Sequence, residues 1–228
     1  ITMKEQNKDI DQLKVFFNNY SSRFSGIYVE DENPRSWFDS IIDKYFRQTV
    51  YQRYANTVSH LENPELNTVL DIGCGPGHYV MSALKLGKKV TALDIASKML
   101  DLTKARVDES EFGASVDYLL ADYMEHTFQN KFDATIVMGF FDYVADPVPF
   151  IKKLLADTSK EIYISVPKND GWQAFQRKIR YWINKCPLYL FSFDQLKSIL
   201  TDSECLSESE IIPMKDGWFV VIRPGATH

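Results

Sequence analysis

The amino-acid sequence predicts an α/β fold built on a doubly wound, mostly parallel sheet, with a C-terminal antiparallel hairpin and an N-terminal helical extension. From residue 65 onward, apolar runs of strand length alternate with amphipathic stretches of helix length, which is typical of a sheet with helices on both faces. The apolar runs are hydrophobic at most positions, as expected for parallel strands buried on both sides. We therefore expect effectively one domain, with an extension of residues 1–64 and a core of residues 65–228.

The N-terminal extension is predicted to be helical. Asn33 is a plausible helix cap, and Pro34 suits the first helical position that follows it. The helix is expected to end before Pro64, because the residue that precedes a proline avoids the helical conformation. Its apolar positions recur at helix spacing and comprise Trp37, Phe38, Ile41, Ile42, Tyr45, Phe46, Val50, Tyr54, Val58 and Leu61.

The core elements follow one another in a regular order. Strands are expected at residues 68–73, 89–94, 116–122, 132–139 and 161–167, and helices at residues 78–87, 97–110, 148–157 and 192–202. Asp146 and Pro147 are expected to begin the third of these helices as cap and first residue. Ser192 and Gln195 form a capping-box pair at the start of the fourth. Residues 209–214 and 217–222 are predicted to form the closing hairpin.

Composition and charge limit the classes of function. The chain has 228 residues and a net charge of −5, so no global attraction to nucleic acid or to an anionic membrane is expected. The three cysteines are few and widely spaced, which favours reduced thiols, and their spacing to the histidines matches no zinc site. No apolar run approaches the length that spans a bilayer. We expect a cytoplasmic protein without a metal site.

A glycine-rich turn at the end of the first strand marks the predicted ligand site. In the stretch VLDIGCGPGHY, residues 69–79, the glycines are Gly73, Gly75 and Gly77. A strand that turns through glycines into a helix places free N–H groups of that helix beside a ligand. A dinucleotide fingerprint would require glycine at position 78, which is His78, and a P-loop would require a lysine that is absent.

VLDIGCGPGHY followed by VTALDIASKML resembles the class I S-adenosylmethionine-dependent methyltransferases, a likeness that covers residues 66–166. It implies a Rossmann-like core, S-adenosylmethionine as cofactor and S-adenosylhomocysteine as product. It also implies that the glycine loop lies under the amino-acid portion of the cofactor and that Asp94 accepts hydrogen bonds from both ribose hydroxyls. Asp71 would orient the loop or receive the ammonium group.

The same resemblance extends the cofactor site to the next two strands. Asp122 and Tyr123, after the third strand, are expected at the adenine, and Met138 is expected at the methyl-donating end. The full set of candidate cofactor residues is Asp71, Gly73, Cys74, Gly75, Gly77, Asp94, Ile95, Met99, Asp122, Tyr123 and Met138.

The acceptor site is expected beyond the fourth strand. Asp142 is the candidate general base and Tyr143 the second candidate catalytic residue. Between Gly171 and Phe193 the chain carries four cations and no acid, and residues 168–192 are a candidate lid. The candidate acceptor-binding residues are Tyr28, Phe140, Arg177, Arg180 and Tyr181.

The lid segment also resembles small stand-alone bacterial methyltransferases, related at a distance to those acting on porphyrin carboxylates and quinone precursors. We expect O-methylation of a small, anionic or carbohydrate-linked metabolite. A compact tRNA methyltransferase and a non-catalytic cofactor-binding partner subunit stay open as alternatives, although the net acidity argues against nucleic acid. An NAD-dependent oxidoreductase is disfavoured by position 78. The sequence leaves the oligomeric state open.

Overall fold

The computed structural model describes residues 12–15, 17–18, 50–112, 116–170 and 188–225. Most of the predicted extension and the larger part of the candidate lid lie outside these residues. Of the extension, the structure describes the helical residues 12–15 and 17–18 and a helix at residues 50–61. The division of the chain at residue 64 therefore stays a prediction.

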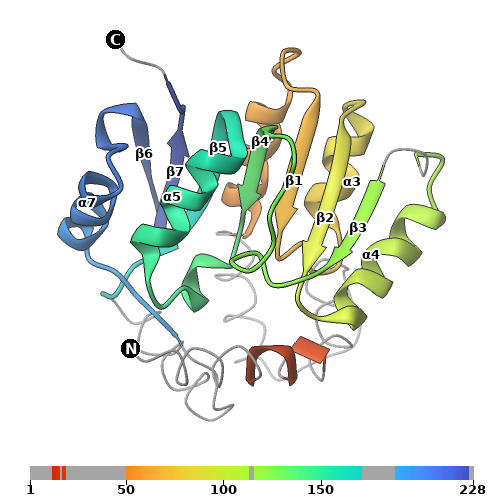
Figure 1. Ribbon diagram of the computed structural model, residues 1–228, viewed down its shortest axis with the longest axis horizontal. Helices are drawn as coiled ribbons and strands as arrows, with labels where there is room; N and C mark the ends of the chain where they lie inside the picture. The colour runs from red at the N-terminus through yellow and green to blue at the C-terminus, as the bar shows by residue number, and fades with distance from the viewer. Residues whose placement is uncertain (1–11, 16, 19–49, 113–115, 171–187, 226–228) are drawn as a thin grey trace.

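The core is a seven-stranded sheet with the strand order β3-β2-β1-β4-β5-β7-β6 (Figure 1). The strands are β1 (Thr68–Ile72), β2 (Lys89–Asp94), β3 (Val116–Leu120), β4 (Phe132–Val137), β5 (Thr158–Pro167), β6 (Ser209–Met214) and β7 (Gly217–Ile222). Strands β1 to β5 are parallel, and β7 pairs antiparallel with both β5 and β6. This topology confirms the predicted fold class, including the antiparallel hairpin at one edge. The order reverses between β1 and β4, where doubly wound sheets bind their ligands.

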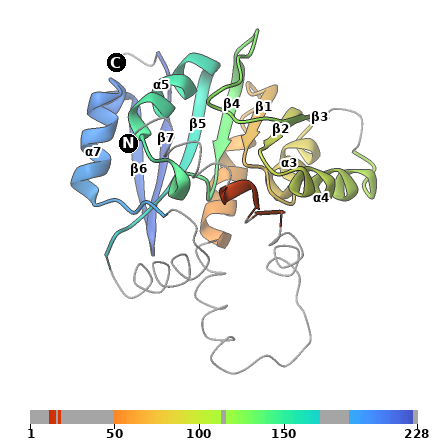
Figure 2. The same cartoon turned by 60° about the horizontal axis from the view of Figure 1, so that its bottom comes forward.

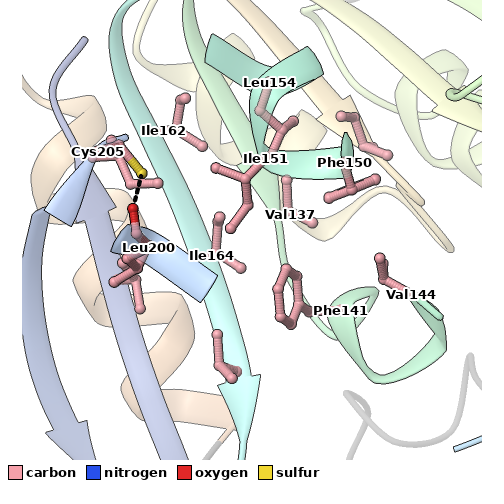
Figure 3. Close-up of a cluster of buried hydrophobic side chains, with 14 of the residues drawn as sticks. Val137, Phe141, Val144, Phe150, Ile151, Leu154, Ile162, Ile164, Leu200 and Cys205 are labelled. Carbon is pink, nitrogen blue, oxygen red and sulfur yellow. Dashed lines mark hydrogen bonds between the residues drawn. The ribbon is translucent and has the colours of Figure 1, made fainter. Parts of the chain in front are cut away.

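Helices cover both faces of the sheet. They are α3 (His78–Lys85), α4 (Ser97–Asp108), α5 (Pro147–Asp157) and α7 (Phe193–Asp202), with short 3-10 turns η2 (Phe141–Tyr143) and η3 (Leu206–Glu208). Side chains of α5 and α7 pack with those of β4 and β5 in one core cluster (Figure 3). Side chains of α3, α4 and the helix of residues 50–61 form a second cluster. In β1, Val69 belongs to the second cluster and Leu70 to the first, because successive strand residues point to opposite faces.

The cap residues of α7 and α5 lie where the sequence predicts them, but only the cap of α7 makes a side-chain hydrogen bond. At α7 the Ser192 side chain accepts from the Gln195 backbone N–H at 3.1 Å, and the Gln195 side chain accepts in return from the Ser192 N–H at 2.7 Å. This capping box is confirmed. Asp146 does occupy the cap position of α5, but its side chain makes no capping hydrogen bond. The predicted cap position and first residue of α5 are thus confirmed, and the proline leaves one N–H fewer to cap.

Within the described residues, no helix is both long and apolar enough to cross a bilayer. The same part of the chain brings no three histidine, cysteine or acidic side chains into an arrangement that could hold a metal ion.

Candidate cofactor and acceptor site

The glycine loop connects β1 to α3 and is tied to the neighbouring strand. The backbone N–H groups of Gly73 and Cys74 both donate to the carbonyl of Leu93, at 2.8 and 3.1 Å. Gly73, Gly75 and Gly77 have φ values of 68, 54 and 78°, a left-handed backbone that side chains with a Cβ disfavour. The loop is thus held at the carboxyl end of β1 in a conformation that needs glycine.

The three glycines have different surroundings. A Cβ at Gly73 would lie 2.6 Å from the ring of Phe140, and a Cβ at Gly77 would lie 2.7 Å from the Thr103 methyl group. At Gly75 the closest atom of the described residues, apart from its chain neighbours, would be 4.0 Å away and is the carbonyl oxygen of Gly73. Packing therefore requires glycine at positions 73 and 77, whereas position 75 leaves one side of the loop open to a ligand.

Helix α4 holds the loop from the other side. The Thr103 hydroxyl donates to the Gly75 carbonyl at 2.6 Å, and Nε of Arg106 donates to the Pro76 carbonyl at 2.8 Å. The Cys74 thiol lies 3.6 Å from the Thr103 hydroxyl. Burial, and secondarily the nearby Asp71 and Asp94, raise the pKa of Cys74 well above its usual value. Sequence reasoning included Cys74 but missed Thr103 and Arg106, since no local pattern marks residues that act on a loop almost thirty positions away.

Asp94 ends β2 beside the loop and orders it. Its Oδ2 accepts from the Gly75 N–H at 3.0 Å and its Oδ1 from the Ala96 N–H at 2.9 Å. The carboxyl is buried, and desolvation raises its pKa, an effect that these backbone N–H groups partly offset. Each carboxylate oxygen can accept a second hydrogen bond, so the group can still bind the two hydroxyls of a diol.

Asp71, in β1, is the most deeply buried acid of the site. Only 1% of it is exposed, and its Oδ2 has no hydrogen-bond partner in the described part of the protein. Burial, and secondarily the nearby Asp94, raise the pKa of Asp71 to about 8. A buried carboxyl oxygen without a hydrogen-bond partner is costly, and a cation bound beside it would supply the missing interaction.

The two residues expected at the adenine differ in placement. Asp122 is partly exposed, and its Oδ1 accepts from the Met124 N–H at 2.9 Å. The Tyr123 side chain is 2% exposed, donates its hydroxyl to Asp157 at 2.9 Å and meets Phe150 edge to face. Burial and the Asp157 carboxylate raise the pKa of Tyr123. Because its ring belongs to the core, the predicted cofactor contact of Tyr123 can involve only its backbone.

Ile95 and Met99 lie near the start of α4. Ile95, just after β2, is half-buried, and Met99 is buried in the first turns of the helix. Ile95 follows Asp94 directly in the chain, and Met99 lies five positions after Asp94. Their roles as cofactor contacts stay predictions.

The carboxyl end of β4 faces the loop. Met138 is buried. The Phe140 ring stacks on Phe150 with ring centroids 5.6 Å apart, and it fills the space that a Cβ at Gly73 would need. Asp142, in η2, is 8% exposed, and its backbone carbonyl accepts from the Tyr189 N–H at 2.8 Å. The structure thus brings the β4 end and the predicted cofactor loop into direct contact, with the candidate base two residues from Phe140.

Two described residues of the N-terminal extension lie over the same end of the sheet (Figure 2). Phe17 meets Tyr143 edge to face at 5.3 Å, and the Asn18 side chain accepts from the Lys98 N–H at 3.3 Å. These contacts hold residues 17 and 18 against η2 and the first turn of α4. Tyr28, Arg177, Arg180 and Tyr181, four of the five candidate acceptor-binding residues, lie outside the described residues.

Arg53 and Ser165, which were not among the candidate residues, lie beside the backbone that follows β4. Ser165, near the end of β5, accepts from the Gly139 N–H at 2.8 Å, and Nη1 of Arg53 lies 3.5 Å from the same hydroxyl oxygen. Arg53 comes from the helix of residues 50–61, which was assigned to the extension. No sequence signal links residues 112 positions apart.

Comparisons with known proteins agree with this geometry. Residues 69–158 match the family model of a methyltransferase domain. A ubiquinone biosynthesis O-methyltransferase of Hydrogenovibrio crunogenus is 31% identical over 176 residues, which cover 74% of this chain and 68% of that protein. One of Xanthomonas axonopodis pv. citri is 35% identical over 86 residues, 37% of this chain and only 35% of its own length. Magnesium protoporphyrin IX methyltransferase from Synechocystis, with bound S-adenosylhomocysteine, shares the fold at a TM-score of 0.69 and 18% identity, covering 92% and 96% of the two chains.

The site also fits the cofactor of this family on its own chemistry. S-adenosylmethionine carries a ribose diol, for which the two oxygens of Asp94 are suited, and an ammonium group, for which the unpartnered Oδ2 of Asp71 is suited. The loop is open above Gly75, where the backbone can be approached. Fold, loop and sequence similarity converge, and the chain belongs to the class I S-adenosylmethionine-dependent methyltransferases.

Proposed function

We propose that this protein transfers the methyl group of S-adenosylmethionine to an oxygen atom of a small metabolite. The observation that carries the proposal is the 31% identity over 176 residues to a protein named for O-methylation in ubiquinone biosynthesis. That similarity extends well beyond the 90-residue span of the domain match, so it includes segments outside the cofactor loop. The acceptor of that relative is not carried over to this chain.

The donor side of the site would act by binding and orientation. Asp94 would hold the ribose diol and, through Gly75, keep the loop in place. Asp71 would pair with the ammonium group, and the open side of Gly75 would admit the amino-acid portion. When bound, the cofactor supplies a methyl carbon that is activated by the adjacent positive sulfur.

The acceptor side would position a hydroxyl and remove its proton. Methyl transfer needs the nucleophile in line with the donor, so positioning can supply much of the rate. Asp142 lies in η2, which follows the carboxyl end of β4, and its carboxylate would accept the hydroxyl proton. Phe140 and Met138 line this end with apolar surface and would exclude water, while Tyr143 packs against Phe17 of the extension.

The test is the release of S-adenosylhomocysteine by the purified protein, supplied with S-adenosylmethionine and with cell extract separated into small molecules, RNA, and protein plus polysaccharide. We expect turnover with the small-molecule fraction and loss of that turnover in Asp142→Asn. Turnover with RNA alone would replace the proposal by the tRNA alternative. Tight cofactor binding without turnover in any fraction would favour a non-catalytic subunit.

A further inference from the structure

We propose that Thr103 is a positioning residue for the cofactor, because its hydroxyl fixes Gly75 in the conformation in which the glycine loop and Asp94 bind S-adenosylmethionine. Thr103 lies in α4 and acts through the loop backbone rather than by contact with the cofactor. The inference concerns the donor side of the site. It therefore goes beyond the proposed function and holds whichever atom of the acceptor is methylated.

The first step is that Gly75 is held by both of its backbone polar groups. Its N–H donates to Oδ2 of Asp94 at 3.0 Å, and its carbonyl accepts from the Thr103 hydroxyl at 2.6 Å. Asp94 ends β2 and Thr103 lies in α4, so two different elements fix this one residue. A Cβ on Gly75 would be 4.0 Å from the closest atom of the described residues outside its chain neighbours. Gly75 is thus fixed at its polar groups and open on the side where a ligand can approach.

The second step is that the residue itself does not hold this conformation. Gly75 has a φ of 54°, and glycine passes between left-handed and other backbone regions at little cost. Contacts from outside the residue must therefore select the conformation. Without the bond from Thr103 the carbonyl side of Gly75 can turn about its Cα, and the N–H that Asp94 binds is no longer held from the other side.

The third step concerns the surroundings of the Thr103 hydroxyl. Thr103 is fully buried, and its oxygen lies 3.6 Å from the Cys74 thiol, which is itself 3.9 Å from the Gly75 carbonyl. Bulk water does not reach this hydroxyl, and a thiol at that distance is a weak donor. Removal of the hydroxyl would therefore leave the Gly75 carbonyl without its short hydrogen bond, which is costly for a buried group.

The fourth step is that α4 holds the loop at a second point. Nε of Arg106 donates to the carbonyl of Pro76 at 2.8 Å. Arg106 follows Thr103 by three positions, and residues at this spacing lie on the same face of a helix. One face of α4 thus presents two donors to two consecutive carbonyls of the loop.

A purely structural role for Thr103 would be to fill space. Its methyl group would lie 2.7 Å from a Cβ at Gly77, so the methyl packs against the turn into α3. The packing contact belongs to the methyl group and the loop contact to the hydroxyl. Substitutions that remove one group and keep the other can therefore separate the two roles.

The experiment uses two pairs of proteins whose members differ at position 103 chiefly in the hydroxyl. Wild type and Thr103→Val both keep the methyl that faces Gly77, whereas Thr103→Ser and Thr103→Ala both lack it. The control is Thr135→Val, which removes another fully buried hydroxyl, bonded to that of Thr158 at 2.6 Å. Thr135 is two positions before Val137 in β4, so it faces the cluster of α5 and α7 and not α4. Titration calorimetry with S-adenosylhomocysteine and urea unfolding are applied to the full chain of each protein.

We expect loss of the hydroxyl to raise the Kd for S-adenosylhomocysteine roughly 5- to 30-fold in both pairs, the range for a buried group that loses its partner. The loop then spends only part of the time in the binding conformation, and the apparent affinity falls by that fraction. Thr103→Ser should bind within about twofold of wild type although it loses the methyl. Thr135→Val should also bind as wild type, although it loses stability.

Equal values of Kd within each pair would overturn the inference, whatever the losses of stability, and would leave Thr103 a packing residue. An increase in Kd for Thr103→Ser as large as that for Thr103→Val would also overturn it, because the effect would then belong to the methyl. The comparison of serine with alanine keeps the test decisive if Thr103→Val does not fold. No acceptor takes part in these measurements, so either outcome leaves the proposed function unchanged.

Discussion

Asp71 is a carboxylic acid that the fold encloses almost completely. In the unfolded chain its pKa is the usual 3.8, whereas in the folded protein burial raises it to about 8. Between these values the folded state binds a proton that the unfolded state has lost, so the free energy of unfolding falls as pH rises through this window. One such group gives a slope of at most about 1.4 kcal/mol per pH unit.

The substitution Asp71→Asn tests this. An amide resembles the protonated acid, so we expect the cofactor-free variant to lack this part of the pH dependence and to be more stable than wild type above pH 8. Urea unfolding of both proteins at pH 5, 7 and 8.5 measures the difference. Parallel pH profiles for the two proteins would contradict the prediction.

Asp94 is expected to have two roles, one in holding the glycine loop and one in binding the ligand. It accepts from the loop through Gly75 and is the candidate partner of the ribose diol. We expect Asp94→Ala to weaken S-adenosylmethionine binding by about 2 to 4 kcal/mol, roughly 30- to 800-fold in Kd. Titration calorimetry measures the effect, and Asp122→Ala is the matched control, with a smaller expected loss because Asp122 is partly exposed. An unchanged Kd for Asp94→Ala would refute the placement of the ribose.

At the scale of the element, two glycines of the loop between β1 and α3 are expected to differ in role: Gly77 is needed for packing against α4, and Gly75 for access of a ligand to the backbone. Gly75→Ala should cost about 1 to 2 kcal/mol of stability, for the left-handed backbone alone, and should strongly reduce cofactor affinity. Gly77→Ala adds a clash with the Thr103 methyl and should lower the free energy of unfolding by about 1 to 3 kcal/mol more. Urea unfolding and calorimetry of the two variants provide the comparison. Equal losses of stability would show that α4 yields to the added methyl group.

Elements were predictable where their signals are local. The strands β1 to β5 and the four core helices lie close to where the apolar runs and the helix spacing put them. A parallel strand that is buried on both faces needs apolar side chains at most positions, although no residue of the edge strand β3 is buried. The capping box at Ser192 could be predicted because its signal is local: both partners lie within four residues. The side-chain cap of Asp146 was not predictable, because residue type permits such a bond without enforcing it.

At the scale of the whole molecule, the site joins residues that no local pattern connects. Asp71, the glycines and Asp94 could be proposed from sequence because they lie at or near the ends of successive strands in a fixed order. The contact between Arg53 and Ser165 had no sequence signal, and the Tyr123 ring, expected at the ligand, packs in the core. Which way a side chain turns at a strand end depends on the packing of distant helices, and only the assembled fold specifies it.

Binding of the cofactor should stabilise the whole fold, since the loop, β1, β2 and α4 all meet at the site. At a free S-adenosylhomocysteine concentration of 100 times Kd, the gain is about 2.7 kcal/mol. For a chain of this size that corresponds to a rise in Tm of roughly 5 to 10 °C, measured by differential scanning calorimetry. NAD at the same concentration should leave Tm unchanged, and an equal rise with NAD would contradict the cofactor assignment.

The enclosed carboxyl of Asp71 has a further consequence for calorimetry. A positive group placed beside it favours the ionised form, so near neutral pH the protein gives up a proton as the cofactor enters. That proton is taken up by the buffer, and the heat of its uptake is part of the signal. The apparent enthalpy of cofactor binding at pH 7 should therefore differ between Tris and phosphate, and Asp71→Asn should remove the difference.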